Sequence, residues 1–292
     1  MAGARVNAWA SRLTRFTSDS DLARLNADPS LPQSPVRPTL ATVLDWAERA
    51  AEHSAGMVDV TLLDARLAAE GLAPRRETFG SGEGGGRGTA GLGPDLTGDP
   101  SSPWKLEQSG RRGGVVHRQP GVRFDLDGVA KGWIADRAAE LLWSWPGALV
   151  DADGDIALHV TAGVEWLIGV LDPRTPDAPN LAVLRIRGES PWRRSLGVAT
   201  SGTTVHRWQR SDGSVSHHLI DPRTGRPAAT DVVQATVVGP SAREAEVLAK
   251  AALILGSTDG LALLGRTAAH AAILVLETGE TVSLPGTGEW LA

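Results

Sequence analysis

The 292-residue sequence contains no cysteine and no tyrosine, and it has only three phenylalanines and two methionines. Without cysteine, disulfide bonds, thiolate metal sites and cysteine nucleophiles are all excluded. No segment approaches the roughly 18 consecutive apolar residues that a membrane-spanning helix needs. The first ten residues lack the long apolar core of a signal peptide. As written, the sequence predicts a soluble, cytoplasmic protein with no membrane span.

The charge balance and the apolar content set further limits. The formal net charge of −5 gives no electrostatic support for binding nucleic acid. Hydrophobic residues make up 41% of the chain, which is enough for a substantial core. At this length the chain can form one large domain or two closely packed lobes.

Apolar periodicity and turn residues predict a mixture of helices and strands. We expect a first helix ending near Thr14, a short one capped by Ser20, and further helices at about 40–56, 131–142, 242–256 and from Asp259. We expect strands at residues 156–160, 166–170, 181–186, 196–200, 232–238, 271–276 and 281–284.

Two segments read as irregular. Residues 29–38 hold four prolines and predict a connector. Residues 80–93 are dense in glycine and contain a G-x-G-x-x-G pattern. No strand leads into this pattern and no helix follows it, so we reject a dinucleotide-binding fold and expect a flexible loop over about 80–114.

Residues 201–227 organise the prediction of function. They contain three of the seven histidines and end in the turn Asp221-Pro-Arg-Thr-Gly225. Two apolar-flanked segments meet at Asp212-Gly213, which indicates a hairpin. This arrangement brings a hydroxyl, an imidazole and a fixed turn together. Taken alone, a surface hairpin with incidental histidines explains it equally well.

A second segment, Phe124-Asp-Leu-Asp-Gly-Val-Ala-Lys-Gly132, leads into a predicted helix. Free N–H groups and the positive end of the helix dipole favour a pyrophosphate there, and Lys131 adds a charge. The alternative is an ordinary capped helix after a strand. In Asp151-Ala-Asp-Gly-Asp155, three carboxylates could suggest calcium, but an EF-hand needs a longer series of ligands, so we favour a tight acidic turn.

These segments together resemble the ApbE family, the FAD:protein FMN transferases. The resemblance rests on Ser201-Gly, a histidine about sixteen residues later and Ile220-Asp-Pro-Arg-Thr-Gly-Arg-Pro227. Asp125-Leu-Asp-Gly-Val-Ala-Lys-Gly132, Gly56-Met-Val-Asp-Val-Thr61 and residues 11–26 also match family motifs, in the family's order. The resemblance implies an α+β fold over residues 1–292, a single domain with antiparallel sheet layers and flanking helices around a flavin cleft.

The implied reaction moves the FMN moiety of FAD onto a Thr or Ser hydroxyl of an acceptor flavoprotein and releases AMP. By resemblance, His218 is the catalytic base, and His217 is its rival if the hairpin register shifts by one residue. An alternative is an FAD-binding relative that has lost transfer. A scaffold that binds no flavin is the third hypothesis.

The resemblance also implies residues that bind FAD. The aromatic position of the family falls on Phe16, for which a core residue is the alternative. The implied FAD-binding residues are Phe16, Met57, Val58, Asp59, Asp125, Lys131 and Ile220.

The implied magnesium site departs from the family pattern. Gly128 would lend its carbonyl, but Glu246 and Lys250 stand where relatives carry Asp and Thr ligands. A charged lysine is not a ligand for a hard cation. Glu246 and Lys250 could form a surface pair, Lys250 could replace the metal, or Mg²⁺ could bind Glu246, the Gly128 carbonyl, phosphate and water. This change, Asp153 in place of a glycine and the absence of the family's first strand favour the alternative that transfer is lost.

Overall fold

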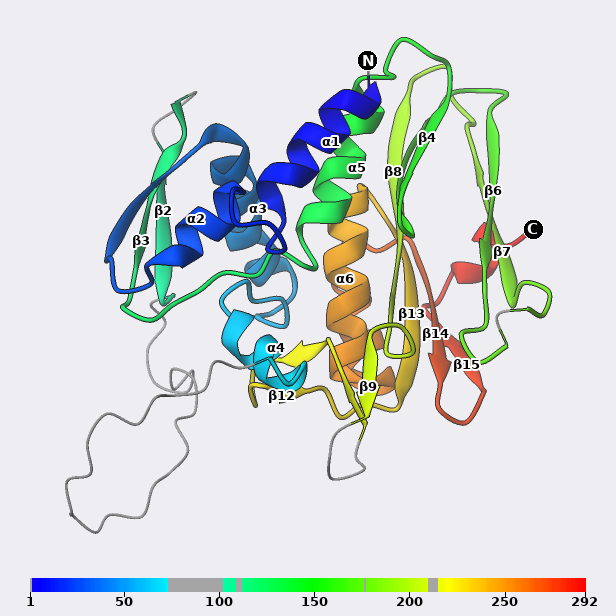
Figure 1. Cartoon of the computed structure of the whole chain (residues 1–292). Helices are drawn as coiled ribbons and strands as arrows, with labels where there is room; N and C mark the ends of the chain where they lie inside the picture. Colours follow the sequence, from blue (N-terminus) through cyan, green and yellow to red (C-terminus); the bar gives the residue numbers. More distant parts are fainter. Residues whose placement is uncertain (1, 73–101, 109–111, 176, 210–214) are drawn as a thin grey trace.

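The computed structural model describes residues 2–72, 102–108, 112–175, 177–209 and 215–292. These residues form a mixture of helices and antiparallel strands, which confirms the predicted α+β class. Figure 1 shows a large sheet beside a central helix, with smaller layers on either side.

The large sheet has six antiparallel strands in the order β15-β14-β13-β8-β5-β4. The strands are β4 Ala148–Ala152, β5 Asp155–Val160, β8 Arg194–Gly202, β13 Val232–Gly239, β14 Ala271–Leu276 and β15 Thr281–Ser283. All of these strands except β4 lie where the sequence predicted a strand.

Each face of this sheet is covered by a different layer, because alternate residues of a strand point to opposite faces. Leu196 and Val198 of β8 pack in one apolar cluster with the hairpin β6 Glu165–Val170 and β7 Ala182–Arg187. Val237 of β13 packs in another cluster with the opposite layer of helices. That layer contains α5 Ala130–Glu140, α6 Ala242–Leu255 and α7 Ser257–Leu264.

The start of α6 lies unusually close to its neighbours. A Cβ placed on Gly197 of β8 would lie 2.1 Å from the Ala242 nitrogen, and one on Gly132 of α5 would lie 2.7 Å from the Ala242 carbonyl group. Asp136 of α5 accepts hydrogen bonds from the N–H groups of Ala242 and Arg243, at 2.9 and 3.2 Å. These bonds satisfy donors that a helix N-terminus otherwise leaves free. Glycine and aspartate in this segment therefore have a packing role that sequence analysis did not anticipate.

The other part of the chain builds a second core. It contains α1 Ala2–Leu13, α2 Asp21–Ala27, α3 Pro38–His53 and α4 Leu63–Ala69, with a sheet in the order β1-β3-β2. Its strands are β1 Gln33–Val36, β2 Trp104–Gln108 and β3 Gly114–Arg118. Edge-to-face aromatic contacts stabilise this core. The ring centroids of Trp104 and Phe124 lie 5.2 Å apart, and those of Trp9 and Trp133 lie 5.9 Å apart.

The two irregular predictions need correction. Residues 29–38 are not only a connector, because they contain β1, an edge strand in which Pro35 is tolerated. The predicted loop over 80–114 contains β2, whose Trp104 and Leu106 are buried. The glycine-rich pattern at 80–93 lies outside the described residues.

Local predictions about caps and turns are confirmed. Ser20 accepts a hydrogen bond from the Ala23 N–H at 2.9 Å and caps α2. The acidic segment forms a tight turn between β4 and β5, in which Asp153 has a φ of 60° and Asp151 accepts a bond from the Gly154 N–H. The hairpin of the 201–227 segment consists of β9 Arg207–Gln209 and β10 Val215–His217, and its tip at Asp212-Gly213 lies outside the described residues.

The remaining elements are the two-stranded pair of β11 Ile220–Asp221 and β12 Arg226–Pro227, and a 3-10 helix near the C-terminus, Thr287–Trp290. Among the described residues, every helix is too short or too polar to cross a membrane.

Gly132→Ala tests the close approach of α5 and α6. The added methyl would lie 2.7 Å from α6 backbone atoms, so we expect a loss of about 1–3 kcal/mol in the free energy of unfolding. Gly3→Ala in α1 is the control, because its Cβ would have no heavy atom within 4 Å. Urea unfolding followed by tryptophan fluorescence measures both variants, and equal midpoints would contradict the packing role of Gly132.

Candidate functional site

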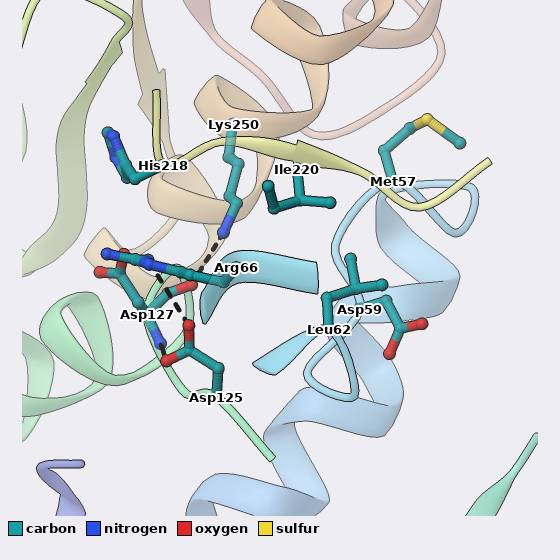
Figure 2. A pocket seen from close by; sticks show the side chains of 9 residues that line it. All are labelled: Met57, Asp59, Leu62, Arg66, Asp125, Asp127, His218, Ile220 and Lys250. Carbon is teal, nitrogen blue, oxygen red and sulfur yellow. Dashed lines mark hydrogen bonds and ion pairs between the residues drawn. The ribbon is translucent and has the colours of Figure 1, made fainter. Parts of the chain in front are cut away.

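A small pocket opens between α4, α6, β11 and the turn that precedes α5 (Figure 2). Its lining residues are Met57, Asp59, Leu62, Arg66, Asp125, Asp127, His218, Ile220 and Lys250. Segments distant in the sequence thus supply one mixed charged and apolar site.

The segment after α3 forms one wall. The Gly56 N–H donates to the Ala51 carbonyl at 2.7 Å, with Gly56 at a φ of 80°, which turns the chain off the helix end. Asp59 then accepts hydrogen bonds at 2.8 Å from the N–H and the hydroxyl of Thr61. Met57 and Asp59 therefore reach the pocket on a fixed turn.

The Asp125 backbone is held from two sides. Asn26 at the end of α2 donates to the Phe124 carbonyl at 2.7 Å and accepts from the Phe124 N–H at 2.8 Å. The Asp125 N–H donates to the Val60 carbonyl at 2.7 Å. These bonds hold the segment 124–127 in place where it lines the pocket.

Arg66 of α4 lies at the centre of a buried ionic network. Its guanidinium donates to Glu70 at 2.8 Å and to Asp127, and it lies 3.5 Å from an Asp125 oxygen. Arg15 donates to the same Glu70 oxygen at 2.6 Å. Burial acts to lower the pKa of Arg66, but Asp127 and Asp125 outweigh it and raise the pKa above its usual range.

The two aspartates are shifted in opposite directions. Burial, followed by the neighbouring Asp127 charge, raises the pKa of Asp125. Burial also acts to raise the pKa of Asp127, but Lys250 and Arg66 outweigh it and hold that pKa below its usual range. Asp127 is therefore the permanent anion between two cations.

Lys250 reaches this cluster from α6. Its Nζ donates to the Asp127 carbonyl oxygen at 2.8 Å, and a Cβ on Gly128 would lie 2.6 Å from the same Nζ. Figure 2 shows the Lys250 and Arg66 side chains converging on Asp127.

The structure distinguishes the two adjacent histidines. His218 lines the pocket, and among the described residues its buried Nδ1 has no hydrogen-bond partner. Burial lowers the pKa of His218 to about 3, with Lys250 and Arg66 adding to the effect and Asp127 opposing it. His217 makes backbone contacts instead, from Nε2 to the Ala228 carbonyl and from Nδ1 to the Leu219 N–H, at 3.1 and 3.3 Å.

The ring of His206 meets that of His218 edge-on, with centroids 5.3 Å apart. His206 has a φ of 53°, in the left-handed region that few non-glycine residues adopt. It packs beside the pocket histidine without being one of the pocket-lining residues.

The turn after His218 has the predicted chemistry. Asp221 accepts a bond from the Arg223 N–H at 2.9 Å, and Gly225 has a φ of 64°. This turn fixes Ile220, a pocket residue that is only 4% exposed.

Lys131 and Glu246 belong to a second ionic network, in which Glu246 and Asp155 are buried. The Lys131 Nζ lies 3.3 Å from an Asp155 oxygen, and Glu246 accepts a hydrogen bond from the Gly132 N–H at 2.9 Å. Burial acts to lower the pKa of Lys131, but Asp155 and Glu246 outweigh it and raise the pKa to about 12. Burial, followed by the Asp155 charge, raises the pKa of Glu246 well above its usual range.

Two other predicted residues lie outside the pocket lining. Val58 belongs to the apolar core beneath the site and is 3% exposed. Phe16 is 79% exposed, with the Arg15 guanidinium 4.4 Å from its ring centroid. The alternative that Phe16 is a core residue is therefore wrong.

The pocket also contains Leu62, Arg66 and Asp127, which the sequence motifs did not predict as site residues. Asp127 stands inside a recognised motif, between Leu126 and Gly128, so its place in that motif could have indicated that it belongs to the site. Arg66 and Glu70 have i,i+4 spacing on a short helix, a pattern that ordinarily indicates an exposed pair.

Lys250, at the third predicted magnesium position, does not fit as a ligand of a divalent ion because its ammonium is charged. The Glu246 carboxylate is buried and accepts from Gly132 on α5, whereas the Lys250 ammonium lies against Gly128. The surface-pair interpretation of Glu246 and Lys250 is therefore wrong. Among the described residues, no group of three or more His, Asp or Glu side chains could hold a metal ion.

The sequence model of the ApbE family matches residues 1–274. This chain belongs to the ApbE family. The match covers every pocket residue, from Met57 to Lys250, and all four segments on which the resemblance was founded.

Several curated relatives of this ApbE chain are named FAD:protein FMN transferase. The one from Treponema pallidum is 35% identical over 158 residues, which cover 50% of this chain and 41% of the relative. The one from Klebsiella pneumoniae is 32% identical over 58% of this chain and 50% of the relative. The chain thus spans half or less of these two relatives. The one from Salmonella typhimurium is 25% identical over 92% of this chain and 73% of the relative.

Solved structures of the family share the fold. The ApbE protein from Thermotoga maritima has a TM-score of 0.76 and 22% identity, covering 100% of this chain and 91% of that one. The apo flavinyl transferase ApbE from Pseudomonas stutzeri has a TM-score of 0.73 and 23% identity, covering 99% and 87%.

His218→Asn tests the burial of the neutral imidazole. An unfolded histidine has a pKa near 6.5, whereas the folded-state pKa of His218 is about 3, so the unfolded chain binds a proton first as the pH falls. We expect wild type to lose about 2 kcal/mol more unfolding free energy than the variant between pH 7 and pH 5. Urea unfolding at both pH values measures this, and parallel losses would show that His218 is not buried as described.

Proposed function

We propose that this chain is an FAD:protein FMN transferase, which moves the FMN moiety of FAD onto a Thr or Ser hydroxyl of an acceptor flavoprotein. The observation that carries the proposal is the pocket. It sets the unpartnered ring nitrogen of His218 beside two fixed cations, Arg66 and Lys250. The names of the relatives support the same activity. We also propose that residues 1–292 act as a single transferase domain.

The transfer needs a base and positive charge, with little covalent chemistry from the protein. The acceptor oxygen attacks the phosphorus on the riboflavin side of the FAD pyrophosphate, and the bridging P–O bond to AMP breaks. The hydroxyl proton passes to His218, and the leaving oxygen departs with AMP. Atoms and charge balance without an oxidant or reductant.

His218 suits the role of base because it is neutral at pH 7. Its pKa of about 3 reflects burial and the nearby cations, which make it a weak base before a ligand binds. A bound pyrophosphate brings negative charge beside the ring, which raises the pKa and makes His218 a stronger base during turnover.

The other implied residues fall into binding roles. Met57, Asp59 and Ile220 line the pocket on turns and would border the flavin, with Val58 packed behind them. Asp125 would contact FAD beside Arg66. The Lys131 side chain, 42% exposed at the start of α5, would contact the pyrophosphate from there. Phe16 offers an exposed ring for stacking.

AMP release tests the proposal. Purified protein is incubated with FAD and a Thr-containing acceptor peptide, and AMP is quantified together with flavin attached to the peptide. Both products are expected. FAD that binds and is recovered intact, with no slow AMP release in the absence of peptide, would indicate a relative that has lost transfer. A protein that binds no FAD would contradict the proposal entirely.

His218→Ala is expected to lower the rate of AMP release by about 100-fold or more, because it removes the base. FAD affinity should change little. His217→Gln is the matched control, because the Gln amide can still donate to the Ala228 carbonyl and His217 does not line the pocket. Single-turnover AMP release and FAD fluorescence quenching measure the two effects. Full activity in His218→Ala would show that another group is the base.

A further inference from the structure

The Lys250 ammonium group lies where any side chain on Gly128 would otherwise be. Gly128 has a φ of 108°, and a Cβ there would lie 2.6 Å from the Lys250 Nζ and 2.9 Å from its Cδ. The missing side chain of Gly128 therefore makes room for the lysine. The hydrogen bond to the Asp127 carbonyl, 2.8 Å long, fixes the ammonium at the pocket.

The two cations of the pocket differ in what they have left to donate. The Arg66 guanidinium is engaged with Glu70, Asp127 and Asp125. A lysine ammonium has three N–H donors. Among the described residues, the structure gives the Lys250 ammonium one hydrogen bond, to the Asp127 carbonyl. Lys250 is therefore the cation with donors available for an incoming anion.

The surroundings hold this cation without a metal. One Glu246 oxygen accepts from the Gly132 N–H of α5 and the other is buried without a partner among the described residues, while the Asp127 carboxylate is held by Arg66. No metal-binding group of His, Asp or Glu side chains exists in the described part of the chain.

We propose that the Lys250 ammonium is the resident cation of this pocket and binds the pyrophosphate of FAD in place of a divalent metal ion. The proposal rests on the transferase function proposed above and adds that this chain binds FAD, and releases AMP from it, without magnesium. The positive charge of Lys250 on α6 then stabilises the negative charge of the pyrophosphate.

Ligand binding gives the first test. The fluorescence of FAD and of riboflavin, which lacks the pyrophosphate, is titrated with wild type, Lys250→Met and Lys105→Met, with EDTA or with excess Mg²⁺. Lys105 is an exposed residue of β2 and serves as the matched control. Wild type is expected to bind FAD equally with EDTA and with Mg²⁺.

Lys250→Met is expected to weaken FAD binding by about 10- to 100-fold, the range for losing a charge-assisted hydrogen bond. Its riboflavin affinity should not change, and Lys105→Met should match wild type for both ligands. Equal loss of riboflavin and FAD binding would show a general disruption of the site and would overturn the proposal.

A metal titration gives the second test. Mn²⁺ binding is followed by electron paramagnetic resonance, with and without FAD. We expect the wild-type protein to provide no Mn²⁺ site. Mn²⁺ binding that Glu246→Gln abolishes would overturn the proposal, as would AMP release that stops in EDTA. The last result would leave the transferase function standing, whereas absence of both FAD binding and AMP release would contradict the function and the proposal together.

Discussion

The close approach of α6 to α5 and β8 is the constraint on which the rest of the structure depends. Gly132 and Gly197 leave no Cβ between the backbones, and Asp136 ties the first N–H groups of α6 to α5. With its start fixed, α6 presents later residues at defined points. Glu246 meets the Gly132 N–H one turn along, and Lys250 meets Asp127 one turn further. The cation in the pocket follows from how two helices pack.

The pocket is charged before any ligand arrives. Arg15, Glu70, Arg66 and Asp127 alternate in sign, and Lys250 completes the series. Removing one member would leave a buried charge without its partner, which is costly in a protein interior. Fixed donors need no reorganisation when negative charge develops on a phosphate. The neutral His218 lies at the edge of this network, and the cations that lower its pKa also leave its ring nitrogen unprotonated.

Errors of sequence analysis arose where burial, rather than local pattern, decided the structure. Four prolines concealed β1, because an edge strand tolerates Pro35 while its neighbours pair with β3. The spacing of Glu246 and Lys250 placed them on one helix face, and an exposed surface pair was one of three interpretations that the sequence left open. In the structure α5 and the turn before it cover this face, so each side chain has a different partner. Arg66 was overlooked for the same reason.

The sequence by itself determined the local elements: the alternating strands, the Ser20 cap, and the Asp221–Gly225 turn that follows two adjacent histidines. These depend on backbone preferences and hydrogen bonds between near neighbours, which residue types reveal directly. Only the tertiary structure decided that His218 faces the pocket while His217 binds backbone. It also decided that Lys250 meets Asp127 across 123 residues of sequence. Such partners depend on which surfaces pack together, and that is a property of the whole chain.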